Sequence, residues 1–159
     1  CSGHAIGGGA VLMLGCDERL GTSEGRFHIH ATGLGIPYPS AVLEIVPQAL
    51  GPAIGKRTLL LGNPVKGSCR QREGWLHDII AGKDLIEHAL LRANQLGELD
   101  SASFANTKLR LLAPSIERIN RNKDADCDAF SKAICQSSTQ ERIGRAIKKL
   151  EARRSKTSQ

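Results

Sequence analysis

The stretch Gly3-His4-Ala5-Ile6-Gly7-Gly8-Gly9-Ala10-Val11 lies at the start of the chain, and the rest of the sequence is organised around it. Its order predicts the end of a strand, a turn of three glycines and the start of an apolar helix. Glycine permits positive φ and lets another group come close to the backbone. A helix that begins at such a turn presents free N–H groups, so the turn is a candidate site for an oxyanion or a phosphate. A tight turn that only packs against a neighbouring element is the alternative.

The composition is that of an ordinary globular chain of one domain. Of the 159 residues, 40% are apolar and only 3% are aromatic, so we expect a mostly aliphatic core. No apolar run approaches the roughly 20 residues of a membrane span, and no membrane partner is expected. The chain opens directly on the motif without a methionine, so we expect a fragment whose targeting segment, if any, lies outside it. The expected location is the cytoplasm.

The distribution of charge and of cysteines limits the kinds of partner and of site that this chain is expected to have. The net charge is +6, and most of it comes from residues 138–159, which hold seven basic and two acidic residues. No aromatic residues interleave with these charges, which makes nucleic acid an unexpected partner and favours a solvated helix face. The five cysteines are scattered and form no C-x-x-C pair, so we expect free thiols and neither a disulfide framework nor a metal site.

Downstream of the motif, extended and helical patterns alternate. Residues 26–30 should be extended, with Phe27 and Ile29 on one face and His28 and His30 on the other. The other expected elements are a short strand at 17–22, a loop at 33–39, a helix capped by Ser40 and kinked or interrupted at Pro47, a helix from Gly51-Pro52 to about Leu61, a strand at 75–80, a helix at 85–96, and a helix at 102–112 capped by Ser101 and stopped by Pro114.

This pattern predicts an α/β protein with a helical C-terminal region. The strand and helix alternation ends near residue 112, and the remainder is polar with two apolar stripes at helical spacing. We therefore divide the chain into a core at 1–112 and a C-terminal part at 113–159, which would hold helices for oligomerisation and the basic tail.

The opening motif, followed by Cys16-Asp17, is similar to the central segment of the crotonase superfamily, the enoyl-CoA hydratases and isomerases. Three further segments resemble the family in order and spacing over about residues 1–112: Gly33-Leu34-Gly35-Ile36-Pro37-Tyr38-Pro39, Gly62-Asn63-Pro64, and Gly74-Trp75-Leu76 with Asp78-Ile79-Ile80. The resemblance implies part of a ββα spiral whose C-terminal helices assemble a homotrimer or a dimer of trimers. It also implies an acyl-CoA thioester as partner, with coenzyme A as part of the substrate and no tightly bound cofactor.

The resemblance further implies roles for individual residues. Gly8 would donate one of the two backbone N–H groups that stabilise an enolate on the thioester oxygen. Gly7, Gly9, Ala31 and Pro37 would lie against the substrate. The second N–H donor of the family belongs to a segment upstream of the motif, outside this chain.

The acid and base residues of the family are the main departure. Its two catalytic glutamate positions correspond here to Val11 and Ala31, neither of which can transfer a proton. His30 neighbours the second position and is the candidate base, since an imidazole titrates near neutral pH. An ordinary polar-face role for His28 and His30 is the alternative. Glu44, on the helix after the loop, fits a structural role better.

Three functional interpretations follow from the resemblance. The first is an enzyme of the enoyl-CoA hydratase/isomerase type that relies on a backbone oxyanion hole. The second is a non-catalytic or truncated homologue that binds coenzyme A thioesters or acts as a scaffold, because both glutamate positions lack a carboxylate. The third is a truncated product that does not fold stably alone. Lys108 and the basic tail are candidate contacts for the coenzyme A phosphates, with a solvated surface as the alternative.

Overall fold

Two short pairs of parallel strands hold the first half of the chain together. The computed structural model describes residues 1–65 and 69–157, with the backbone alone at 69–70 and 153–157. Strand β1 (Ala5–Ile6) pairs with β3 (Phe27–His28), so that Ala5 lies opposite Phe27. Strand β2 (Leu20–Gly21) pairs with β4 (Asp78–Ile79) in the same sense. The expected α/β class with a helical C-terminal region is confirmed.

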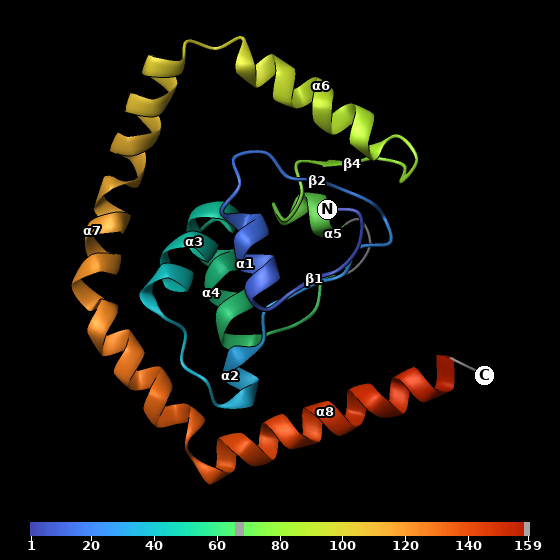
Figure 1. The fold of residues 1–159 in the computed structure, drawn as a ribbon, viewed down its shortest axis with the longest axis vertical. Helices are drawn as coiled ribbons and strands as arrows, with labels where there is room; N and C mark the ends of the chain where they lie inside the picture. Colours follow the sequence, from blue (N-terminus) through green and yellow to red (C-terminus); the bar gives the residue numbers. More distant parts are fainter. Residues whose placement is uncertain (66–68, 158–159) are drawn as a thin grey trace.

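Helices make up most of the remaining structure. The five shorter helices of the first half pack around the strands, while three long helices run around this core as a frame (Figure 1). In chain order the helices are α1 (Gly8–Leu14), α2 (Ala31–Leu34), α3 (Ser40–Leu50), α4 (Pro52–Leu61), α5 (Cys69–Arg72), α6 (Leu85–Gly97), α7 (Ser101–Ile134) and α8 (Ser137–Thr157).

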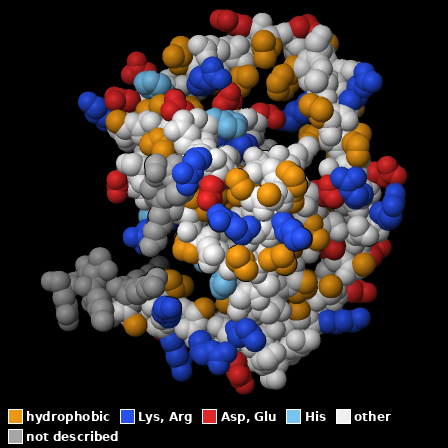
Figure 2. All heavy atoms as spheres, turned by 180° about the vertical axis from the view of Figure 1, so that it is seen from behind, with side chains coloured by type: hydrophobic (Ala, Val, Ile, Leu, Met, Phe, Trp, Pro, Cys, Tyr) orange, Lys and Arg blue, Asp and Glu red, His pale blue; other side chains and the backbone are white. Residues whose placement is uncertain are grey.

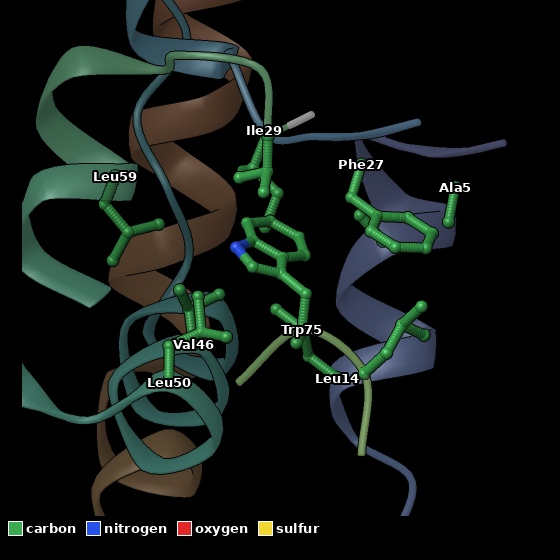
Figure 3. Close-up of a cluster of buried hydrophobic side chains, with 11 residues drawn as sticks. Ala5, Leu14, Phe27, Ile29, Val46, Leu50, Leu59 and Trp75 are labelled. Atoms are coloured by element: carbon green, nitrogen blue, oxygen red, sulfur yellow. The ribbon is translucent and has the colours of Figure 1, made fainter. Parts of the chain in front are cut away.

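The core forms where the alternating strand residues meet the helices. Phe27 and Ile29 point inward, as their spacing predicts, and are 0% and 2% exposed. The ring of Phe27 stacks on Trp75, with centroids 5.9 Å apart and planes within 10° (Figure 3). Val46 from α3 and Leu59 from α4 close the other side of the indole (Figure 3). This cluster fixes α1, β1 and β3 relative to one another, and therefore the glycine turn.

The predicted end of a helix at Pro114 is wrong. Helix α7 has 34 residues and continues through the proline to Ile134, so the boundary placed at 112/113 falls inside one helix. A proline removes only one helical hydrogen bond, and the segment beyond it is held by contacts to α3. Arg118 bonds both carboxylate oxygens of Glu44, and Asp126 accepts hydrogen bonds from the Ser40 backbone N–H and hydroxyl.

Three other local expectations need correction. Part of the expected loop at 33–39 is helical, because α2 extends to Leu34 before Gly35 turns the chain with φ of 80°. Ser40 is the first residue of α3 and not its cap, since its hydroxyl and N–H both serve Asp126. At α7 the cap is Asp100 in place of Ser101, and its carboxylate accepts the Ser103 N–H at 2.8 Å.

Glu44 has the structural role that its position on the helix predicts. Hydrogen bonds from Arg118 and then Ser115 lower its pKa from 4.5 to about 2. A carboxylate with a lowered folded-state pKa stabilises the fold above its unfolded pKa, and this contribution is lost as the pH falls from about 4.5 to about 2.

We expect Glu44→Gln to flatten the dependence of the melting temperature on pH between about 4.5 and 2 and to lower that temperature at neutral pH. Thermal unfolding followed by circular dichroism at several pH values measures this. The matched control is Glu117→Gln, whose partner Arg121 lies in an exposed pair on the same helix, and it should leave the profile unchanged. An unchanged profile in Glu44→Gln would contradict the role of Glu44.

None of the helices in the described ranges combines the length and the apolar character that crossing a membrane requires.

Candidate functional site

The glycine turn is anchored on one side and open on the other. Gly7 has φ of 58° and donates its N–H to the carbonyl of His28 at 2.8 Å. Its own carbonyl accepts the N–H groups of Ala10 and Val11 at 3.1 and 3.2 Å. The N–H groups of Gly8 and Gly9 are left without a backbone acceptor in the part of the chain that the structure describes.

The turn faces open space on the side toward which a Cβ of each glycine would project. An ideal Cβ placed at Gly7, Gly8 or Gly9 would meet no atom within 4 Å. The glycines are therefore not required by packing against a neighbour in the described structure, and only the positive φ of Gly7 demands one. Two free donors at the positive end of α1, with room in front of them, are the arrangement that an oxyanion needs.

The two positions that correspond to the catalytic glutamates of the family hold side chains that cannot transfer a proton. Val11 lies on α1 and packs against the buried core. Ala31 is the first residue of α2, and its N–H donates to the hydroxyl of Tyr38 at 3.0 Å. Neither position brings a titratable group to the turn, so any proton transfer must use another residue.

His30 and His28 lie next to one another at the end of β3. Their rings stack with centroids 5.1 Å apart and planes within 17°. His28 Nε2 donates to the carbonyl of Gly62 at 2.6 Å, while His30 caps α2 and is exposed. The expected placement of these two side chains on the same face is confirmed, and the Gly7 bond to His28 connects them to the glycine turn.

The other residues considered from the sequence are partly or fully exposed. Pro37 is exposed between α2 and α3. The ammonium of Lys108 pairs with Asp17 and lies 6.0 Å from the centroid of the Phe104 ring, so it is already engaged. On α8 the basic side chains of the described part are exposed (Figure 2).

Sequence reasoning missed a second polar cluster, beside β2, β4 and α6. Glu18 accepts hydrogen bonds from Arg92 at 2.6 Å and from His77 at 3.1 Å, and the Arg92 bond lowers its pKa. The buried Arg19 lies 2.8 Å from the other ring nitrogen of His77, and burial lowers the pKa of its guanidinium. A pocket of about 520 Å³ opens beside this cluster. Residues 59 positions apart give no local signal that they meet.

No group of three or more His, Cys, Asp or Glu side chains is placed to hold a metal ion within residues 1–65 and 71–152.

Comparisons with a family profile, with individual proteins and with solved structures each give matches that cover most of this chain. The family profile described as enoyl-CoA hydratase/isomerase matches residues 1–155. A crotonyl-CoA hydratase of Syntrophomonas wolfei is 24% identical over 157 residues, which is 95% of this chain and 58% of that protein. The bacillaene synthase decarboxylase PksI of Bacillus subtilis is 23% identical over 141 residues, which is 89% of this chain and 57% of that protein.

A solved structure confirms the fold. The enoyl-CoA hydratase/isomerase of Pseudoalteromonas atlantica superposes with a TM-score of 0.81 at 21% identity, covering 92% of this chain and 59% of the other. This chain thus spans somewhat over half the length of these relatives. The expected crotonase-like fold, present in part, is confirmed, and with the profile match over 155 residues it establishes that this protein belongs to the enoyl-CoA hydratase/isomerase family of the crotonase superfamily.

Proposed function

We propose that this protein acts on acyl-CoA thioesters and stabilises an enolate at the thioester oxygen with the N–H of Gly8. The observation that carries the proposal is the pair of unpartnered N–H groups at Gly8 and Gly9, which face open space at the start of α1. Family membership supplies the substrate class. Coenzyme A enters as part of the substrate, and no tightly bound cofactor takes part.

The chemistry follows from the charge that develops in the reaction. Removing a proton from the carbon next to the thioester moves negative charge onto the carbonyl oxygen. Donors that already point at this oxygen stabilise the transition state without reorganising, and one such donor is worth about 10²- to 10³-fold in rate. Gly7 and Gly9 border the donor without side chains, so the thioester can come close to the backbone. The same turn would place the acyl chain near Ala31 and Pro37.

His30 is the proposed proton-transferring group. Its side chain is exposed, and within the described residues neither ring nitrogen is bound to another group. An imidazole nitrogen can accept or donate a proton in a reaction. It stands one residue before Ala31 and two residues after His28, whose carbonyl accepts the Gly7 N–H.

A second candidate reaction is decarboxylation of a carboxyacyl thioester. The observation that favours it is the absence of a carboxylate at both Val11 and Ala31, together with the similarity to a decarboxylase. When the carbon–carbon bond to the carboxylate breaks, its electron pair forms the enolate and CO₂ leaves. The enolate carbon then takes a proton from water or from His30. This route needs the oxyanion donor but no base.

We propose a homotrimer or a dimer of trimers, in the cytoplasm, as the working form. Support for assembly comes from large apolar side chains that remain exposed along the frame helices, including Ile86, Leu90 and Leu91 on α6 and Leu109 and Leu111 on α7. The four described free cysteines are all exposed, which suits a reducing compartment.

Turnover of crotonyl-CoA, followed by the loss of its conjugated thioester absorbance, tests the proposal. Release of CO₂ from methylmalonyl-CoA tests the second reaction, and calorimetry with acetyl-CoA measures binding. Turnover of either substrate supports an enzyme. Binding without turnover would overturn the catalytic proposal in favour of a thioester-binding module. Neither turnover nor binding in a cooperatively melting protein would overturn both.

For the hydration reaction, His30→Ala should lower kcat by about 10²-fold or more, because a methyl group cannot transfer a proton. The absorbance assay measures this at saturating crotonyl-CoA. His88→Ala changes an exposed histidine on α6 and should leave turnover unchanged. If His30→Ala retains full kcat, then His30 is not the base.

A further inference from the structure

The ring of His30 is held more tightly than its exposure suggests. An ideal Cβ at Gly33 would lie 1.9 Å from His30 Nε2, and one at Gly62 would lie 2.2 Å from His30 Nδ1. The two ring nitrogens therefore lie directly against two glycines, where a side chain of any size would displace the imidazole. The ring of His28 stacks on it at a centroid distance of 5.1 Å. These contacts restrict the rotamers that the exposed imidazole can adopt.

The orientation of His28 is itself fixed by a hydrogen bond. Its Nε2 lies 2.6 Å from the carbonyl oxygen of Gly62, and a carbonyl can only accept. Nε2 must therefore carry a proton, and in the neutral ring Nδ1 is the unprotonated nitrogen. Because Gly62 also lies against the His30 ring, one residue both orients His28 and makes room for His30.

The backbone connects this pair to the glycine turn. Ile6 of β1 lies opposite His28 of β3, and the Gly7 N–H donates to the His28 carbonyl at 2.8 Å. His28 is thus bound through its main chain to the turn that holds the oxyanion donor and through its side chain to the ring of the proposed base. A shift of the glycine turn would therefore be transmitted through His28 to the ring of His30, and a shift of that ring to the turn.

We propose that His28 is the positioning residue of His30: its stacked ring, in a cradle formed by Gly33 and Gly62, holds the His30 imidazole in a fixed orientation for proton transfer at the acyl thioester. This inference rests on the proposed function, which gives His30 its task. His28 does not touch the substrate and acts only through its neighbour. Correct placement of a reacting group has a large effect on the reaction rate, since a displacement of about 1 Å can lower that rate about 10²-fold.

Imidazole NMR of the ¹⁵N-labelled full chain tests the positioning directly. In the wild-type protein, the ring of His28 should be in the Nε2–H form, and the ring protons of His30 should be shifted by stacking. His28→Leu removes the aromatic face, and the stacking shift of His30 should be lost. His28→Phe keeps the face and should retain it. His28→Gln keeps a donor for the Gly62 carbonyl without a ring, which separates the stack from the hydrogen bond and provides a second non-aromatic variant if Leu does not fold.

Kinetics on the same variants give a readout that a purely structural role would not move. With crotonyl-CoA, His28→Leu and His28→Gln should lower kcat by about 10²-fold with KM nearly unchanged, and His28→Phe should restore most of kcat. Unchanged His30 signals in His28→Leu, or equal loss of kcat in Leu and Phe, would overturn the positioning role alone. Absence of turnover in the wild type would overturn the proposed function, and with it the task of His30, whatever the spectra show.

Discussion

Replacing Gly8 with proline should lower kcat for crotonyl-CoA by about 10²- to 10³-fold while the protein stays folded. Gly8 is the first residue of α1, a helix position that tolerates proline because its N–H has no partner inside the helix. The substitution therefore removes the proposed oxyanion donor and costs the helix no hydrogen bond. The absorbance assay measures the rate, and circular dichroism measures the melting temperature.

Gly8→Ala is the matched control for this experiment. It keeps the N–H, and its Cβ would meet no atom within 4 Å, so the fold should accept it. The loss of kcat should be far smaller than in Gly8→Pro. Equal losses in the two variants would show that open space at this position matters and the N–H does not, and would contradict the proposed role of Gly8.

Replacing Trp75 with alanine should cost the largest share of stability of any single change considered, about 3–5 kcal/mol of unfolding free energy. The side chain is fully buried and stacks on Phe27 at 5.9 Å between the glycine-turn strands and the helices α3 and α4 (Figure 3). Its removal leaves a cavity that surrounding side chains fill only in part. Urea unfolding followed by circular dichroism measures the loss, since the only tryptophan of the chain is gone.

Trp75→Phe separates the packing from the polar edge of the ring. The indole Nε1 is buried and finds no hydrogen-bond acceptor within the described residues, so its removal carries no loss of a bond. Phenylalanine keeps an aromatic face against Phe27, and the loss of stability should be well under half that of alanine. A loss as large as that of Trp75→Ala would contradict the view that stacking and volume dominate at this site.

Local patterns predicted the part of the fold that depends on neighbours in sequence. The three glycines between an apolar strand and an apolar helix gave the turn, and the alternation of residues 26–30 gave the buried Phe27 and Ile29. Glu44 was also interpreted correctly as structural. Each of these signals lies within one element, where the periodicity of the chain determines which side chains face inward.

Contacts between distant residues account for what the sequence could not show. Pro114 is a valid local stop signal, but beyond it Arg118 and Asp126 of α7 bind Glu44 and Ser40, which are 74 and 86 positions away from them. The cradle around His30 depends on Gly62, and the cluster of Glu18 depends on His77 and Arg92. Periodicity carries no information about which loops meet, so these features appear only once the chain is folded.

The uninterrupted course of α7 has a mechanical consequence. At about 1.5 Å per residue, its 34 residues measure roughly 50 Å along a curved axis (Figure 1), and the helix is bound to α3 at Arg118 and Asp126. A helix of this length sets both the separation and the relative rotation of the segments at its ends, α6 and α8. Each residue added to or removed from it beyond these contacts would turn α8 by about 100° about the helix axis. The number of residues in α7 thus determines the directions in which α6 and α8 present their surfaces.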